Sequence, residues 1–414
     1  MHPTMTRMAI ALVLAGLTAG PGFGLTPQRA KAKPKAAVRH SAKALLPRSG
    51  AEARASSKAR WNVASAHSPI SHLRSTRASR ISRLRIFFNP WTEPTFADST
   101  LGDRVDGEDL IVRRAAVQAL GPYNGTVVAV EPQTGRILTI VNQNLAFKSG
   151  FQPCSTIKLV VALAGLNEGL IDRNTLVPIG RRSSLDLTNA IAHSNNSYFA
   201  SIGMRLGFDK VSHYAKLYGL GEKACINCPE EQPGTLPESA PAEGLGMMTS
   251  FGSGINLTPL QLASLVTAVA NGGTLYHLQH PRTQQEVDQF QPKAKRQLQI
   301  AQWIPEVKPG MEGAVEYGTA RRASYNPNEP IFGKTGTCSD VRSPGVHLGW
   351  FGSFNETGNK KLVVVVLLTG GRPINGPVAS GVAGSVYRNL SEEGYFGAAQ
   401  VTSASLQTVS SQVE

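Results

Sequence analysis

Three short motifs follow one another along the chain and together supply the groups needed to attack an amide bond beside a carboxylate. They are Ser155-Thr156-Ile157-Lys158, Ser194-Asn195-Asn196 and Lys334-Thr335-Gly336-Thr337. The first offers a nucleophile and a base, the second a hydroxyl for proton transfer, and the third a cation with hydroxyls. Each motif is common by itself, so the prediction depends on their joint context.

The first motif predicts a serine nucleophile activated by a lysine. Pro153 and the apolar run after it favour a helix over 158–168 that opens near Ser155. Residues three apart share a helix face, so the Lys158 amine can reach the hydroxyl. A lysine acts as a base only when burial and a nearby cation lower its pKa, and Lys334 is the candidate cation. The alternative is chance, because a chain of this length should contain roughly one or two Ser-x-x-Lys strings.

The second motif is weak until it is placed, because Ser-x-Asn occurs three times, at Ser194, Ser324 and Ser353. Ser194 is favoured because it lies within a helical pattern predicted over 185–206. A serine in a helix interior can compete for backbone hydrogen bonds, so its presence there suggests a specific role. Ser194 is the predicted proton relay, and Asn196 the predicted partner of a substrate amide. A solvated helix surface is the alternative interpretation.

The third motif lies in a strand predicted over 331–338. In an ideal strand, alternation places Lys334 and Gly336 on one face and Thr335 and Thr337 on the other. A cation with two hydroxyls suits a carboxylate, and Gly336 lets a substrate backbone approach closely. A plain Lys-Thr-Gly turn would be the commoner explanation of this motif alone.

Strand patterns at both ends of the chain surround helical patterns in the middle. This order predicts an α/β (α+β) fold, in which a central antiparallel sheet is flanked by helices and carries an inserted all-helical lobe. The expected strands are a hairpin, 125–131 with 136–141, and three later runs, 331–338, 347–354 and 362–369. Further helices are expected over 260–270 and 378–390.

Charge and length define the remaining organisation. The chain has 414 residues, of which 41% are hydrophobic, and a net charge of +14. Residues 28–85 hold fifteen Lys and Arg but one acid, so the rest of the chain is close to neutral. We expect 28–85 to be a basic disordered tether, either a plain linker or one attracted to an anionic envelope surface. Nucleic acid is not an expected partner of an exported protein.

Residues 1–27 are expected to be a signal peptide or a short membrane anchor. The apolar run from Met8 to Ala19 is shorter than the roughly 20 residues that span a bilayer, which favours a cleaved signal. The protein is therefore expected in the bacterial cell envelope or periplasm. Residues 86–119 are expected to dock on the folded domain, beginning with the apolar 86–91, and 393–414 to form a flexible tail.

The cysteines do not predict a metal site. Cys225 and Cys228 have the spacing of half a zinc site, but a second such pair is missing. A local disulfide or two free thiols are the alternatives, and disulfides are permitted in an exported protein. Neither a metal nor a cofactor is expected.

Residues 120–392 resemble a penicillin-binding protein transpeptidase domain, of the serine D,D-peptidase and β-lactamase superfamily. Besides the three motifs, the resemblance is carried by three stretches: GTVVAVEPQTGRILTIV, AIAHSNNSYFASIGMRLGFDKVSHYAKLYGLG and FGSGINLTPLQLASLVTAVANGG. The resemblance implies that Ser155 is acylated, with Lys158 as its base. It implies that Ser194 relays a proton and that Asn196 holds the substrate's side amide.

The resemblance also implies how the substrate is held. Lys334, Thr335 and Thr337, in the strand with Gly336, would bind the terminal carboxylate. The backbone N–H groups of Ser155 and Thr337 would form the oxyanion hole. Certain carbapenem-hydrolysing class A β-lactamases have a disulfide at the positions of Cys154 and Cys338, which implies that these two cysteines are bonded here.

The leading hypothesis is a D,D-transpeptidase that cross-links peptidoglycan stem peptides ending in D-Ala-D-Ala, and that β-lactams acylate. A D,D-carboxypeptidase and a serine β-lactamase use the same residues, and a β-lactam sensor without turnover is a third alternative. No Glu-x-x-Leu-Asn segment, the source of the deacylating Glu in class A β-lactamases, lies between Lys158 and Lys334. Asn196 argues against a class D β-lactamase. No glycan polymerisation is expected, since only the basic tether precedes the domain.

Overall fold

The computed structural model describes residues 94–340 and 345–397. The predicted signal or anchor, the basic tether, the apolar 86–91 and the end of the tail lie outside these residues. The elements, in chain order, are α1 (Leu110–Leu120), β1 (Gly125–Glu131), β2 (Arg136–Val141), α2 (Gln143–Ala146), the 3₁₀ turn η1 (Cys154–Ile157), α3 (Lys158–Asn167), β3 (Val177–Pro178), β4 (Ser184–Leu185), α4 (Leu187–Ala192), α5 (Asn196–Leu206), α6 (Phe208–Leu217), α7 (Leu245–Phe251), α8 (Pro259–Ala270), β5 (Thr274–Tyr276), α9 (Gln284–Asp288), β6 (Ala294–Gln297), α10 (Ile304–Glu316), η2 (Arg321–Ala323), β7 (Ile331–Ser339), β8 (His347–Asn355), β9 (Val363–Gly370) and α11 (Gly376–Glu392).

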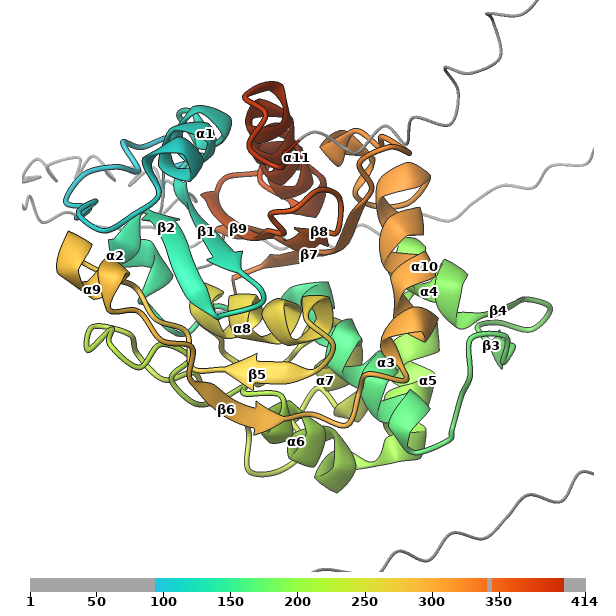
Figure 1. The fold of residues 1–414 in the computed structure, drawn as a ribbon. Helices are drawn as coiled ribbons and strands as arrows, with labels where there is room; N and C mark the ends of the chain where they lie inside the picture. The colour runs from blue at the N-terminus through green and yellow to red at the C-terminus, as the bar shows by residue number, and fades with distance from the viewer. Residues whose placement is uncertain (1–93, 341–344, 398–414) are drawn as a thin grey trace, which may run out of the picture. The chain divides into compact units, whose positions relative to one another are not determined.

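Both ends of the described chain contribute to one central sheet. Its five strands are all antiparallel and lie in the order β2-β1-β9-β8-β7. Helices α1 and α11 cover one face, and α8 covers the other (Figure 1). The fold class expected from the sequence is confirmed.

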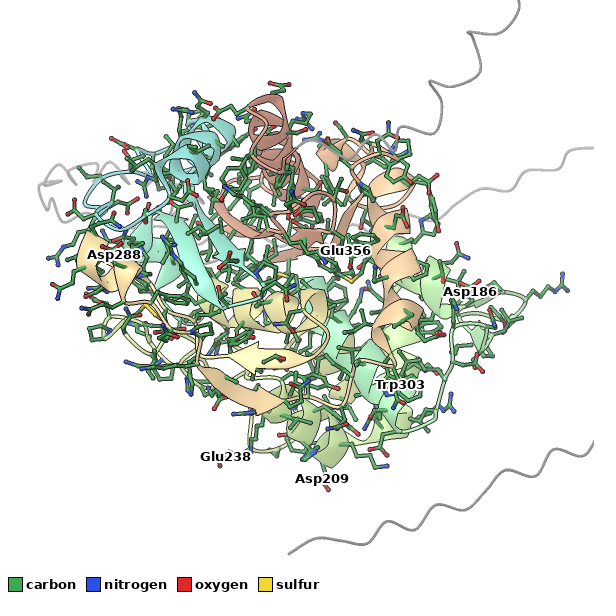
Figure 2. All side chains as sticks on the ribbon, in the orientation of Figure 1. Asp186, Asp209, Glu238, Asp288, Trp303 and Glu356 are labelled. Carbon is green, nitrogen blue, oxygen red and sulfur yellow. A yellow bond between two sulfur atoms is a disulfide. The ribbon has the colours of Figure 1, made fainter. Side chains whose placement is uncertain are left out.

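The sheet is buried on both faces because its strands are apolar at odd and even positions alike. In β9, residues 363, 365 and 367 pack into the core on the α8 side, and 364, 366 and 368 pack into the core under α1 and α11. Continuous Val and Leu runs are typical of such doubly covered strands. Charged side chains such as Asp209, Glu238 and Asp288 project outward (Figure 2).

The part of the chain between β2 and β7 is mainly helical, and it also contains two small two-stranded sheets, β3–β4 and β5–β6. The sequence predicted an all-helical insertion. The strands of these sheets are two to four residues long, which is too short for the apolar alternation that marks a strand.

The N-terminal part of the described chain lies against this sheet. Of the predicted docking segment, residues 94–119 are described. Phe96 forms a bridge with Tyr123, and α1 buries Val112, Ala115 and Leu120. Among the described residues, no helix combines the length and apolarity that crossing a bilayer requires.

Candidate active site

Ser155 lies in the 3₁₀ turn η1, directly before α3. The preceding residue, Cys154, has a positive φ of 51°, which turns the chain sharply into η1. The Ser155 side chain is nearly buried, with 8% of its surface exposed. Its Oγ lies 3.0 Å from Nζ of Lys158 and 3.5 Å from the carbonyl oxygen of Ser250 on α7. The predicted spacing of three therefore brings hydroxyl and amine into contact.

Lys158 is fully buried at the first residue of α3. Its Nζ donates to the carbonyl oxygen of Ser194 at 2.6 Å and to Oδ1 of Asn196 at 2.6 Å. Oγ of Ser194 is 3.1 Å away. The amine therefore contacts the hydroxyls of both candidate catalytic serines.

Burial lowers the pKa of Lys158 from 10.5 to about 7. Burial, and then the neighbouring charge of Lys158, lower the pKa of Lys334 well below its ordinary value. The sequence predicted that burial and a nearby cation, Lys334, would both lower the pKa of Lys158; burial is the cause found here. A substantial fraction of Lys158 is therefore neutral at physiological pH.

Ser194 lies at a break between α4 and α5, where the sequence predicted one helix over 185–206. Its φ is +54°, outside the helical region, and the side chain of Asn195 caps α5 by accepting from the N–H of Tyr198. Ser and Asn stabilise helix starts better than helix interiors. The single long helix was therefore wrong. Oγ of Ser194 accepts a 2.7 Å hydrogen bond from Nζ of Lys334, so it lies between the two lysines.

The other two Ser-x-Asn serines lie elsewhere. Ser353 donates from β8 to the backbone oxygen of Val364. Ser324 follows η2 and lines a separate pocket with Tyr325. Within the described residues, only Ser194 among the three contacts the candidate lysines.

Strand β7 presents the third motif along the same site. A Cβ atom at Gly336 would lie 3.0 Å from the carbonyl oxygen of Pro153, so a larger residue there would crowd the segment that carries the nucleophile and push it away by a few tenths of an ångström. Oγ1 of Thr335 is 2.7 Å from Oγ1 of Thr319. Oγ1 of Thr337, which is solvent-exposed, accepts from the N–H of Gly376 at the start of α11. That acceptance leaves the Thr337 O–H free to donate.

Two disulfides are present. Cys154 is bonded to Cys338, with their Cα atoms 5.6 Å apart, and the bond joins the residue before Ser155 to the residue after the Lys-Thr-Gly-Thr motif. The second bond closes the loop between Cys225 and Cys228. The first disulfide therefore fixes β7 next to the start of the nucleophile's turn.

Several contacts at the site were missed by the sequence analysis. They come from the hydroxyl of Thr319, which touches the motif residue Thr335, from the backbone oxygen of Ser250, and from Trp350, whose Nε1 donates to the backbone oxygen of Gln152. A backbone oxygen leaves no signal in the sequence. Thr319 stands in a Gly-Thr-Ala string without apolar periodicity, so only its tertiary position reveals it.

Comparison with known proteins identifies the family of this chain. The family model "Penicillin binding protein transpeptidase domain" matches residues 125–392. Stage V sporulation protein D of Bacillus subtilis is 28% identical over 320 residues, which cover 65% of this chain and 49% of the relative. Peptidoglycan D,D-transpeptidase PbpA of Mycobacterium tuberculosis is 25% identical over 317 residues, covering 61% of this chain and 63% of the relative.

Comparison with solved structures shows a similar fold. The transpeptidase domain of penicillin-binding protein 3 from Burkholderia pseudomallei superimposes with a TM-score of 0.59 at 23% identity, over 69% of this chain and 95% of that domain. The chain spans less than two thirds of the length of either sequence relative. The matched residues include all three motifs, and the chain belongs to the penicillin-binding protein transpeptidase domain family.

Proposed function

We propose that this protein is a serine D,D-transpeptidase that cross-links peptidoglycan stem peptides through an acyl-Ser155 intermediate. The observation that carries the proposal is the 3.0 Å contact between Oγ of Ser155 and Nζ of a buried Lys158 whose pKa is about 7. A base with a pKa near the working pH is the most effective. The names of the relatives support this activity, and an enzyme that acts on peptidoglycan would work at the cell envelope.

The hydrogen-bond inventory of Lys158 explains how the hydroxyl is activated. A neutral amine has two N–H groups and one lone pair. The carbonyl oxygen of Ser194 and Oδ1 of Asn196 can only accept, so they take the two N–H groups. The lone pair then remains for the Ser155 O–H. Asn196 thereby orients the base through Oδ1, and its amide N–H₂ remains for the substrate's side amide.

Acylation needs the developing negative charge to be stabilised. The backbone N–H groups of Ser155 and Thr337 are the proposed donors to the oxyanion, each worth about 3 kcal/mol of transition-state stabilisation. As the C–N bond breaks, the hydroxyl of Ser194 passes a proton to the leaving D-Ala amine, and the proton taken by Lys158 replaces it over the 3.1 Å contact.

The terminal carboxylate of the substrate is proposed to bind Lys334, Thr335 and Thr337. A carboxylate beside Lys334 raises the pKa of that lysine again, so the ammonium form is regained when substrate binds. An amine of a neighbouring stem then enters where D-Ala left, and Ser194 accepts its proton in the reverse direction. The amine forms the new amide bond as the acyl–oxygen bond to Ser155 breaks, and the proton passes from Ser194 through Lys158 to the freed Ser155 oxygen.

Incubation with a fluorescent penicillin tests the proposal. The full chain should form a stable covalent adduct on the peptide that contains Ser155, mapped by mass spectrometry. Ser155→Ala should abolish the adduct, whereas Ser239→Ala, at an exposed loop position, should leave it unchanged. Adduct formation on Ser155→Ala would refute the site, and rapid release of ring-opened penicillin would favour a β-lactamase.

A further inference from the structure

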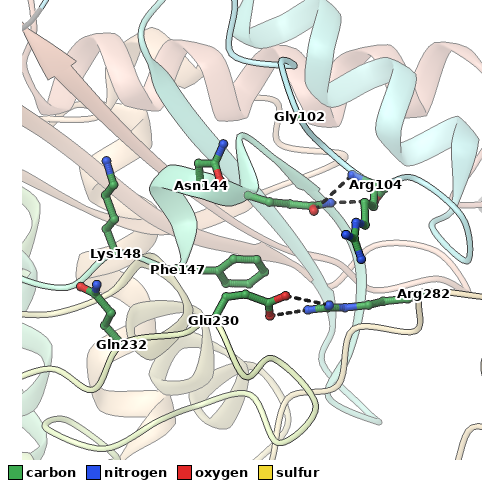
Figure 3. A pocket seen from close by; sticks show the side chains of 9 residues that line it. Gly102, Arg104, Asn144, Phe147, Lys148, Glu230, Gln232 and Arg282 are labelled. Atoms are coloured by element: carbon green, nitrogen blue, oxygen red, sulfur yellow. Dashed lines mark hydrogen bonds and ion pairs between the residues drawn. The ribbon is translucent and has the colours of Figure 1, made fainter.

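A polar cavity of about 350 Å³ lies in the described part of the chain, and none of the candidate catalytic residues lines it. It is formed by the segment before α1, by α2 with the two residues after it, by residues 230–232, which follow the loop closed by Cys225 and Cys228, and by Arg282 before α9 (Figure 3). Its lining residues are Gly102, Arg104, Gln143, Asn144, Phe147, Lys148, Glu230, Gln232 and Arg282.

The lining carries three cations and one carboxylate. Arg282 and Glu230 form a two-point ion pair, with N–O distances of 2.9 and 2.7 Å. This pairing lowers the pKa of Glu230 to about 2, with a further small contribution from Arg104. The carboxylate therefore stays charged and is already neutralised by Arg282.

The other two cations form no direct ion pair with any residue that the structure describes. No ion pair or side-chain hydrogen bond joins the Arg104 guanidinium or the Lys148 ammonium to another described residue. In Figure 3 they lie on either side of the Phe147 ring. Two unpaired cations separated by an aromatic ring favour a ligand with two anionic groups and a less polar middle.

Two side-chain amides, those of Asn144 and Gln232, also line the cavity. The side chain of Asn144 makes no hydrogen bond with a described residue, and Gln232 uses its Oε1 to accept from Ser149 while its N–H₂ has no partner there. A side-chain amide can donate a hydrogen bond to a peptide carbonyl and accept one from a peptide N–H. The lining therefore favours a peptide over a phosphate polymer.

The cavity wall is held rigidly. The N–H of Gln232 donates to the backbone oxygen of Phe147 at 2.8 Å, which joins the two sides of the cavity. The buried carboxylate of Glu231 accepts from the backbone N–H groups of Ala224 and Cys225. These contacts are present without a ligand, so the wall need not become ordered on binding, and the entropic cost of binding is lower.

We propose that this cavity binds an acidic peptide with two carboxylates, one at Arg104 and one at Lys148. The peptide backbone lies over Phe147 and contacts Asn144 and Gln232. This binding is independent of the proposed acyl transfer, since it uses none of the residues assigned to that reaction.

The test uses the full chain and three probes: acetyl-Glu-Ala-Glu-amide, its neutral counterpart acetyl-Gln-Ala-Gln-amide, and a glycerol phosphate trimer. None carries D-Ala-D-Ala, so the outcome does not depend on catalysis. Isothermal titration should give at least about tenfold tighter binding for the acidic peptide than for the other two. A photoreactive acidic probe should cross-link to residues 144–148 or 230–232, which separates this site from the basic residues 28–85.

Charge variants distinguish the cavity from general attraction to a basic protein. The double variant Arg104→Gln with Lys148→Gln should weaken acidic-peptide binding at least about tenfold. Arg181→Gln with Lys293→Gln removes the same charge from exposed positions outside the cavity and should have no effect. Equal loss in both variants, equal binding of the neutral peptide, tighter binding of the phosphate trimer, or cross-links confined to 28–85 would each overturn the proposal.

Discussion

Lowering the pH from 8 to 5.5 should slow acylation of Ser155 by penicillin about thirtyfold. The base must be neutral, and burial places the pKa of Lys158 at about 7. At that pKa about nine tenths of the amine is neutral at pH 8, and about 3% is neutral at pH 5.5. The rate should therefore rise with pH, reach half its maximum near pH 7, and level off above pH 8.

An ordinary lysine would give a different profile. With a pKa of 10.5, well under 1% of the amine would be neutral at pH 8, and the rate would rise nearly tenfold for each pH unit up to pH 10. Stopped-flow acylation by a fluorescent penicillin between pH 5 and 10 separates the two cases, and circular dichroism checks that the fold persists. A rate that still climbs steeply between pH 8 and 10, or one that is flat from 5.5 to 8, would refute the role of Lys158.

Two further predictions test the surroundings of the base. Asn196→Asp places a carboxylate where Oδ1 now lies 2.6 Å from Nζ of Lys158. The carboxylate stabilises the charged lysine, so the midpoint of the acylation profile should move upward by about one pH unit or more. The control Asn195→Asp keeps the helix cap and should leave the midpoint near 7 in the same assay. Replacing Cys154 and Cys338 by Ser opens a bond across 184 residues and should lower the free energy of unfolding by up to about 5 kcal/mol in urea titrations. Opening the Cys225–Cys228 disulfide should lower the free energy of unfolding by only about 2 kcal/mol, because it closes a much shorter loop in the unfolded chain. Equal losses in the two variants would contradict this dependence on loop length.

Local patterns in the sequence predicted the elements that carry the site. The expected strand over 331–338 is β7, Ile331–Ser339, and the expected helix over 260–270 is α8, Pro259–Ala270. These segments have strong apolar patterns bounded by clear signals, such as the Thr258 capping box before α8. The Ser155–Lys158 contact was also predictable, because it needs only one turn of chain.

Contacts that depend on tertiary packing were not predictable. Gly336 was expected to make room for substrate, and the atom nearest to a side chain there is the backbone oxygen of Pro153, about 180 residues earlier in the sequence. The partner of Thr335 is Thr319, on the loop after α10. Neither pairing has a periodic signal, because each joins segments that meet only when β7 packs against the helices.

The break at Ser194 joins the failed prediction to the chemistry. In a continuous helix the backbone oxygen of Ser194 would point along the helix axis and accept from the N–H four residues later. At the break it accepts from Nζ of Lys158 at 2.6 Å instead, and the same residue places its hydroxyl 2.7 Å from Nζ of Lys334. One residue outside regular structure thus contacts both lysines. A substitution that restored a continuous helix would turn this carbonyl group away from Lys158 and move the hydroxyl away from Lys334. The proposed proton transfer therefore depends on the break between α4 and α5.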